Sequence, residues 1–275
     1  GQALGIAEAA YREGLKYAHE REQFGKAIIR FPAVYEMLVK SKLKIVGARA
    51  LLYFATKYVD LRDVYEEHNK DKEAVTPESR QTEKRYSKIA GVLTPLSKAW
   101  CTEIANEVCY DTIQIHGGTG FMRDFPAERL YRDARITNIY EGTTQLQFVA
   151  AIGGVLLRVL DPILAELSHL PYEGKLRRLA STVDVAHGKL LRVVEQVEKK
   201  RDKDYHDLMA GRLCQMEMIV LISYLLLQDA LVDKERTTMV ESFICQFMPE
   251  LEMHFQVISS SDYSMIDNHE NILGM

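Results

Sequence analysis

The stretch Tyr140-Glu141-Gly142-Thr143-Thr144 decides how the fold of this chain is interpreted. An apolar, strand-like run leads into it, and an amphipathic helix follows it. A carboxylate at such a junction is well placed to accept a proton from a bound substrate. The glycine beside it lets another group approach the backbone closely. Taken alone, Glu141 is better explained as an acidic residue in the first turn of the next helix, where the helix dipole stabilises its charge. The rest of the chain is needed to decide between this structural role and a catalytic one.

Apolar residues with helical spacing predict helices on both sides of this stretch. After it a helix runs to about residue 159, and before it the predicted helices are 3–20, 32–62, 83–115 and 126–135. Pro95 is expected to kink or interrupt the helix that contains it. The polar residues 65–82 are expected to form an exposed, partly helical connection. Strand-like residues are confined to Ile136, Ile139 and Tyr140, so the predicted fold class is all-α.

A second, smaller helical unit is predicted over residues 160–275, after a first domain of residues 1–159. Its first helix repeats apolar residues at heptad spacing, which is typical of antiparallel helix packing. Those residues are Leu176, Leu179, Val183, Ala186, Leu190, Val193 and Val197. Two further helices are predicted at about 204–231 and 237–253, and the residues from Ser259 onward are expected to be loose.

Composition excludes several kinds of protein. The net charge is −4 and there is no long basic block, which argues against nucleic-acid binding. The four cysteines form no CxxC pair and no Cys/His ligand spacing, so neither a metal site nor a disulfide framework is indicated. They favour a reducing compartment such as the cytoplasm, and no signal peptide is visible. The most apolar run, 216–227, is short and contains Glu217, so no transmembrane segment is predicted.

The chain enters a helical pattern directly after Gly1, without an N-cap residue. We therefore expect the chain to be a fragment of a longer protein.

Two further segments carry residue types that suit a nucleotide-like ligand. In Arg21-Glu22-Gln23-Phe24-Gly25-Lys26, an arginine can grip a pyrophosphate and an aromatic ring can pack on a flat ligand ring. In Gln114-Ile115-His116-Gly117-Gly118-Thr119-Gly120-Phe121, three glycines follow a helix and let a ligand approach the backbone. Each segment alone also has a structural explanation, as a surface loop and as a helix C-cap. His116 is better explained as a buried structural histidine than as a ligand contact.

The glycine-rich segment, extended through Asp124, Arg129 and Asp133, resembles the C-terminal signature of the acyl-CoA dehydrogenases. Ile139 to Thr143 resembles the catalytic segment of that family, and Arg21 to Lys26 resembles its flavin-gripping loop. The three segments occur in the family's order, and the resemblance covers about residues 1–157.

The resemblance implies a four-helix up-and-down bundle from the C-terminal part of a larger flavoenzyme. Glu141 is implied as the catalytic base that removes the α-proton of a fatty acyl-CoA, with its N–H polarising the thioester carbonyl. FAD is the implied cofactor. Its implied contacts are Arg21, Gln23, Phe24, Gln114 and Gly118 across a subunit interface, and Thr143 and Gln145 near the catalytic loop.

The resemblance also implies a trans-2-enoyl-CoA product, an electron-transfer flavoprotein as electron acceptor, and a homodimer or homotetramer. Two alternatives stay open. An acyl-CoA oxidase would pass its electrons to oxygen, and a helical assembly module derived from this fold would have no activity. Residues from about 160 onward extend beyond the compact members of the family, and we expect them to dock on the bundle or on another subunit. Acyl chain length is not readable from these residues.

Overall fold

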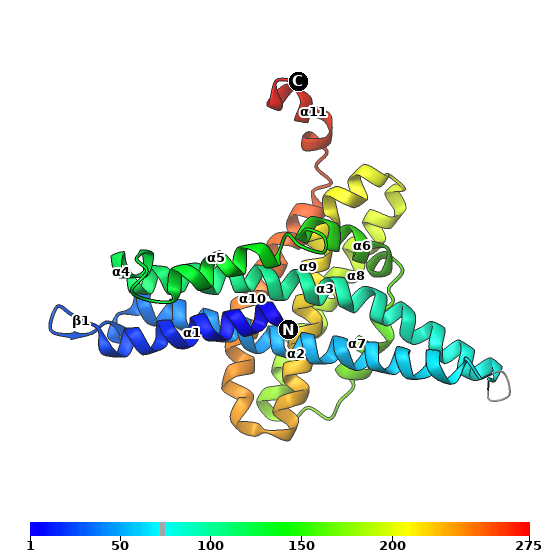
Figure 1. Ribbon diagram of the computed structural model, residues 1–275. Helices are drawn as coiled ribbons and strands as arrows, with labels where there is room; N and C mark the ends of the chain where they lie inside the picture. The colour runs from blue at the N-terminus through cyan, green and yellow to red at the C-terminus, as the bar shows by residue number, and fades with distance from the viewer. Residues whose placement is uncertain (72–74) are drawn as a thin grey trace. The chain divides into compact units, whose positions relative to one another are not determined.

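The computed structural model describes residues 1–71 and 75–275, and its elements are almost entirely helical, as predicted (Figure 1). The chain divides into two compact units, residues 1–52 with 97–147 and residues 53–96 with 148–275. The long helices α2 (Pro32–His68) and α3 (Pro77–His116) each contribute one part to each unit. The domain boundary between residues 159 and 160 stays a prediction.

The first unit contains four helical segments that alternate in direction (Figure 1): α1 (Gln2–Glu20), the first part of α2, the last part of α3, and α5 (Ala127–Thr137). Hydrogen bonds and an ion pair join α3 to each of the other three. Thr112 Oγ1 donates to Ala10 O at 3.0 Å, Asn106 Nδ2 donates to Ala134 O at 3.1 Å, and Lys44 Nζ lies 2.6 Å from a carboxylate oxygen of Glu107. The predicted up-and-down arrangement is therefore present in this unit.

Small residues allow α1 to pack closely in this unit. Ala7, Ala10 and Ala18 have no exposed surface, and a Cβ added at Gly14 would lie 3.4 Å from Thr112 Oγ1. Burial of such an apolar face contributes most of the stability of a helix in a bundle. Small residues spaced three or four apart on one face of α1 thus let its backbone approach α3 closely.

A short antiparallel ribbon joins α1 to α2, where the sequence predicted only a loop. Its strands are β1 (Glu22–Gln23) and β2 (Lys26–Ala27), with Glu22 opposite Ala27. The two turn residues, Phe24 and Gly25, have φ angles of 50° and 78°. Positive φ at both central positions is typical of the type I′ turn, which matches the twist of a two-stranded ribbon. A short 3₁₀ helix, η1 (Ile28–Arg30), follows before α2 begins.

The second unit is built around α9 (Lys203–Val232), which packs against α7 (Asp161–Ser168), α8 (Gly174–Lys200) and α10 (Thr237–Ser259). Tyr224 of α9 donates its hydroxyl to Asp184 Oδ1 of α8 at 2.6 Å. The predicted heptad positions of α8 are buried, except that Leu179 is half-buried. The 3₁₀ helix η2 (Lys234–Arg236) separates α9 from α10.

Several local predictions were wrong. Ile136, Ile139 and Tyr140 are not a strand: α5 extends to Thr137, and the N–H groups of Ile139 and Tyr140 both donate to Ile136 O at 3.0 Å in a turn. The helices on either side of segment 65–82 are longer than predicted, since α2 extends to His68 and not to about residue 62, and α3 begins at Pro77 and not at about residue 83; residues 72–74 lie outside the described residues. The described part of the segment is mostly exposed, as predicted. The tail contains a helix, α11 (Ser264–Leu273), although none of its residues is buried.

Pro95 lies inside α3 without ending it. A proline removes one helical hydrogen bond and costs about 3 kcal/mol. The buried residues on either side offset this cost, because Leu93 and Leu96 are fully buried and each contributes about 1.5–3 kcal/mol.

Helix α9 is long and apolar enough to cross a membrane by length and composition alone. The sequence prediction considered only its shorter run 216–227 and therefore missed this. In its most apolar 18-residue part, 83% of the residues are buried inside the structure. The central helix of a bundle has the same composition, because it is surrounded by other helices.

Candidate active site

Five of the predicted cofactor-binding residues belong to the segment of the β1 ribbon, the last turn of α3 and the start of α4 (Gly118–Phe121): Arg21, Gln23, Phe24, Gln114 and Gly118. Figure 1 shows the β1 ribbon and α4 close together at one end of the first unit. A hydrophobic cluster of Ala18, Ile28, Leu38 and Ile115 ties the ends of α1 and α3 to the residues after the ribbon. The two segments that the sequence singled out separately are therefore neighbours.

The ribbon presents Phe24 to solvent. Its side chain is 91% exposed at the tip of the turn, and its ring meets the Phe31 ring edge-on at a centroid distance of 6.3 Å. Arg21 and Gln23 are also exposed, while the Arg21 backbone is fixed by hydrogen bonds to Tyr17 O and from Ile28 N, both 2.8 Å. An exposed aromatic ring beside a cation and an amide is suited to contact a flat, anionic ligand.

The glycine turn requires glycine at specific positions. Gly117 follows α3 with φ 63° and ψ −141°, a backbone conformation that is essentially restricted to glycine. A Cβ added at Gly120 would lie 2.6 Å from His116 Cβ and 2.8 Å from Ile113 O, so this residue packs directly on the last turn of α3. Gly118 is exposed with open space where a Cβ would be, and the first N–H groups of a helix have no intrahelical partner.

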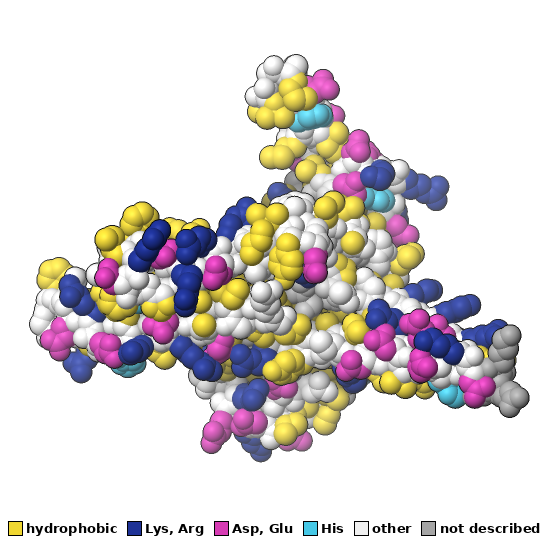
Figure 2. All heavy atoms as spheres, viewed as in Figure 1, with side chains coloured by type: hydrophobic (Ala, Val, Ile, Leu, Met, Phe, Trp, Pro, Cys, Tyr) yellow, Lys and Arg dark blue, Asp and Glu magenta, His cyan; other side chains and the backbone are white. Residues whose placement is uncertain are grey.

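His116 is buried at this turn, as predicted. Its ring stacks on Tyr17 at 4.2 Å, and its Nδ1 lies 2.8 Å from Thr112 O. Tyr17 in turn bonds Thr119 Oγ1 through its hydroxyl at 3.1 Å. His116 thus holds the glycine turn onto the end of α1. Figure 2 shows hydrophobic side chains gathered over α4, where Phe121 and Met122 are 80% and 54% exposed.

The loop that carries Glu141 has an unusual backbone. Glu141 itself has φ 55°, and Gly142 follows with φ 98°. A positive φ is uncommon outside glycine, and residues held in such conformations cluster at functional sites. The Glu141 side chain is exposed, and in residues 1–71 and 75–275 no group accepts a hydrogen bond from its backbone N–H. Both its carboxylate and its N–H are therefore available to a ligand.

Two side chains hold the carbonyl groups of this loop. Lys98 of α3 donates from Nζ to Tyr140 O at 2.7 Å and also to Gly142 O. Gln147 of α6 (Thr144–Leu156) donates from Nε2 to Glu141 O at 3.1 Å and to Gly142 O at 3.3 Å. Burial lowers the pKa of Lys98, and the nearby Glu141 carboxylate acts in the opposite direction. Three successive carbonyls are thus turned toward the protein.

Glu103 anchors the two ends of the loop. Its Oε1 accepts hydrogen bonds from Asn138 Nδ2 at 3.1 Å and from the hydroxyl of Thr144, which is buried. Thr144 N also donates to Asn138 O at 3.3 Å. The loop therefore starts and finishes at one carboxylate on α3.

The two remaining predicted cofactor-binding residues, Thr143 and Gln145, lie at the Glu141 loop and the start of α6. Thr143 is half-buried, and its Oγ1 accepts from Leu146 N at 3.5 Å. Gln145 is exposed in the first turn of α6. Tyr140 bonds Gln2 Oε1 through its hydroxyl at 3.1 Å, which fixes the loop beside the start of α1.

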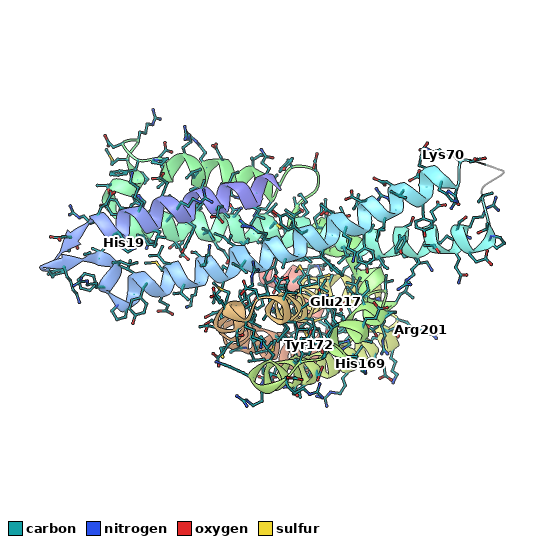
Figure 3. The ribbon with its side chains drawn as sticks, turned by 90° about the horizontal axis from the view of Figure 1, so that it is seen from below. His19, Lys70, His169, Tyr172, Arg201 and Glu217 are labelled. Atoms are coloured by element: carbon teal, nitrogen blue, oxygen red, sulfur yellow. The ribbon has the colours of Figure 1, made fainter. Side chains whose placement is uncertain are left out.

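The structure therefore brings the predicted residues together in two groups, not one. The ribbon follows the last turn of α1, which contains His19 (labelled in Figure 3), whereas the Glu141 loop lies beside its first turn. A 19-residue helix is about 28 Å long. Within one chain, Glu141 and Phe24 are too far apart to contact the same reacting ring.

Three residues that hold the Glu141 loop from neighbouring helices were not predicted from the sequence: Lys98, Gln147 and Glu103. The signal for Lys98 was a lysine within an apolar part of a helix, between the buried Ser97 and Ala99. Gln147 and Glu103 had no comparable signal, because their role depends on where α3 and α6 lie in the fold.

Comparison with known families identifies this arrangement. Residues 1–152 match the family model described as acyl-CoA dehydrogenase, C-terminal domain, and residues 160–260 match the model described as acyl-CoA dehydrogenase C terminal. The first match covers more than half of the chain, and the chain therefore belongs to the acyl-CoA dehydrogenase family.

Curated relatives agree with this family. The chain is 36% identical over 157 residues to the caffeyl-CoA reductase–Etf complex subunit CarC of Acetobacterium woodii, covering 57% of this chain and 35% of the relative. It is 35% identical over 148 residues to the probable acyl-CoA dehydrogenase FadE25 of Mycobacterium tuberculosis, covering 54% and 32%. The chain thus spans about a third of the length of these relatives.

Solved structures share the fold over most of the chain. An acyl-CoA dehydrogenase from Bacillus anthracis in complex with FAD is matched with a TM-score of 0.72 at 23% identity, covering 93% of this chain and 46% of that one. Caenorhabditis elegans ACDH-11 in complex with C11-CoA is matched with a TM-score of 0.73 at 18% identity, covering 89% and 41%. Both matches extend into the second helical unit.

Proposed function

We propose that this chain is the C-terminal part of an FAD-dependent acyl-CoA dehydrogenase that converts a fatty acyl-CoA into a trans-2-enoyl-CoA. One observation carries the proposal: Glu141 presents an exposed carboxylate and an unpaired backbone N–H from a loop in which Lys98 and Gln147 hold three successive carbonyl groups. A base and an oxyanion donor on one residue suit proton removal next to a carbonyl.

In this proposal, the Glu141 carboxylate takes the α-proton of the acyl-CoA. The Glu141 N–H donates to the thioester oxygen and stabilises the negative charge that develops there, which acidifies the α-proton. The left-handed backbone at Glu141 and Gly142 presents both groups from a single short loop. Glu103 and Gln147 keep the loop in place, so little reorganisation is needed during the reaction.

The chemistry of the two residue groups fits FAD as the cofactor. Bound FAD would accept the hydride from the β-carbon. The exposed Phe24, Arg21 and Gln23, together with Gln114 and Gly118, would hold it from one end of a subunit. Thr143 and Gln145 would contact it beside the catalytic loop of another. Because the two groups lie at opposite ends of α1, we propose a homodimer or homotetramer in which each site draws on two subunits.

The remaining features of the proposal follow from the family and from composition. Electrons would leave to an electron-transfer flavoprotein; one relative is named as a subunit of a reductase–Etf complex. All four cysteines are free, which supports a reducing compartment such as the cytoplasm.

The test is Glu141→Gln in the full-length protein. We expect reduction of the flavin by acyl-CoA under anaerobic conditions to fall by at least about 10³-fold, since the amide cannot accept the proton. Turnover that survives with little loss would remove Glu141 as the base, and inactivity of the unaltered protein toward every acyl-CoA would favour a non-catalytic assembly module. Admitting air after reduction separates an oxidase, which reoxidises at once, from a dehydrogenase.

A further inference from the structure

Lys98 holds the catalytic loop, but the proposed reaction gives its positive charge no role of its own. Its ammonium group touches two carbonyls of the catalytic loop, Tyr140 O at 2.7 Å and Gly142 O, and lies 5.4 Å from the centre of the Tyr140 ring. It forms no ion pair with a carboxylate in the described part of the chain, whereas most lysines in helical bundles are solvated or paired. A half-buried ammonium directed at backbone oxygens needs an explanation.

The geometry of the peptide bond supplies that explanation. Tyr140 C=O and Glu141 N–H belong to one planar trans peptide group, so they point in opposite directions. Fixing the oxygen on Lys98 therefore aims the Glu141 N–H away from α3, toward the exposed side of the loop. The second contact does the same for the peptide between Gly142 and Thr143.

The charge of Lys98 adds a second effect. A hydrogen bond from an ammonium group to a carbonyl is charge-assisted and polarises the peptide group. The N–H at the other end of that group then becomes a stronger donor. A neutral donor such as the Gln147 amide, which holds the Glu141 carbonyl, cannot polarise to the same degree.

We infer that Lys98 is a positioning residue that aims and polarises the Glu141 N–H at the thioester oxygen of the acyl-CoA. This role rests on the proposed function of the loop. It predicts that the positive charge at position 98 matters for the chemical step and not for the binding of substrate.

Three variants of the full-length protein test the inference. Lys98→Met removes the charge and both hydrogen bonds at similar length, and Lys98→Arg keeps the charge and donors. Lys88→Met is the matched control, because Lys88 is an exposed lysine of the same helix. We expect Lys98→Met to lower the rate of flavin reduction by about 10- to 100-fold, less than the loss of an oxyanion donor itself, with the Kd for acyl-CoA changed by less than about 3-fold. Lys98→Arg should recover most of the rate, and Lys88→Met should match the unaltered protein.

A spectroscopic measurement tests directly whether Lys98 acts on the thioester carbonyl. In a Glu141→Gln background, bound acyl-CoA is not consumed, and isotope-edited infrared spectroscopy reports the stretch of its labelled thioester carbonyl. Adding Lys98→Met should move that band toward its frequency in water. Hydrogen exchange at residues 138–147, measured without substrate, should also become faster in Lys98→Met.

Equal rates and equal carbonyl frequencies in Lys98→Met and Lys88→Met would overturn the inference while leaving Glu141 as the base. Failure of the proposed function is a different result, inactivity of the unaltered protein. If Lys98→Met does not fold, Lys98→Gln replaces it, since it keeps one amide donor and removes only the charge; an unchanged carbonyl band there would reject polarisation.

Discussion

The Tyr17 ring lies nearly flat on the imidazole of His116, with ring centroids 4.2 Å apart and planes inclined by 23°. Phe125 meets both rings edge-on, at 5.4 Å and 5.3 Å. This contact joins the last part of α1 to the glycine turn, and so it couples the two segments that carry Arg21 and Gly118.

Tyr17→Leu should therefore destabilise the protein by about 2 kcal/mol, through lost ring stacking and the lost hydrogen bond to Thr119. Tyr17→Phe keeps the ring and should cost only about 1 kcal/mol. Chemical denaturation measures both free energies of unfolding. Equal losses in the two variants would assign the effect to the hydroxyl alone.

Gly120→Ala should destabilise the glycine turn by about 1–3 kcal/mol, because the added methyl group would overlap His116 Cβ and the backbone oxygen of Ile113. Gly118→Ala is the matched control, since a Cβ there meets nothing within 4 Å. Thermal unfolding of the two variants compares them directly. A Gly120→Ala variant as stable as Gly118→Ala would contradict the close packing of this turn.

Phe24→Ala should leave the free energy of unfolding unchanged, because the side chain is 91% exposed. In the proposed flavoenzyme it should raise the Kd for FAD by about 10-fold, the value of one lost aromatic contact. Val232→Ala, at a side chain 90% exposed in the second unit, should change neither quantity. Flavin fluorescence released on dilution measures the affinity, and an unchanged Kd would remove Phe24 from the cofactor site.

Glu217 makes stability depend on pH. It lies among the helices of the second unit (Figure 3), and burial, with a smaller contribution from Asp161, raises its pKa to about 8. The folded protein then binds a proton that the unfolded chain has lost between about pH 4.5 and 8, so stability falls as the pH rises through this window. The loss is at most about 5 kcal/mol.

Glu217→Gln should abolish that slope and leave the variant more stable than the unaltered protein at pH 8.5. The control is Glu195→Gln, where Lys199 holds the pKa of an exposed carboxylate below its usual value, so that this group adds no slope above pH 5. Urea denaturation at pH 5.5 and 8.5 supplies the comparison. A slope that persists in Glu217→Gln would mean that another group titrates.

The helices could be predicted because their apolar spacing is strong, and the residues of α8 from Leu176 to Val197 illustrate this. Local preferences that tertiary packing overrides could not be predicted. Pro95 is retained inside α3 because its neighbours are deeply buried, and Ile136 continues a helix although its type favours a strand.

In the candidate site, too, residues of contiguous motifs could be predicted and residues brought in by the fold could not. Glu141, Phe24 and the glycine turn belong to contiguous motifs and were found from the sequence. Lys98 and Glu103 reach the catalytic loop from α3, at least 35 residues away along the chain, so only the fold reveals them.

The length of α1 has a genetic consequence. A subunit altered at Arg21 keeps its own Glu141 loop intact, and a subunit altered at Glu141 keeps its own ribbon intact. If each site draws on two subunits, two such inactive variants produced together would complement one another, because some mixed sites receive both unaltered ends.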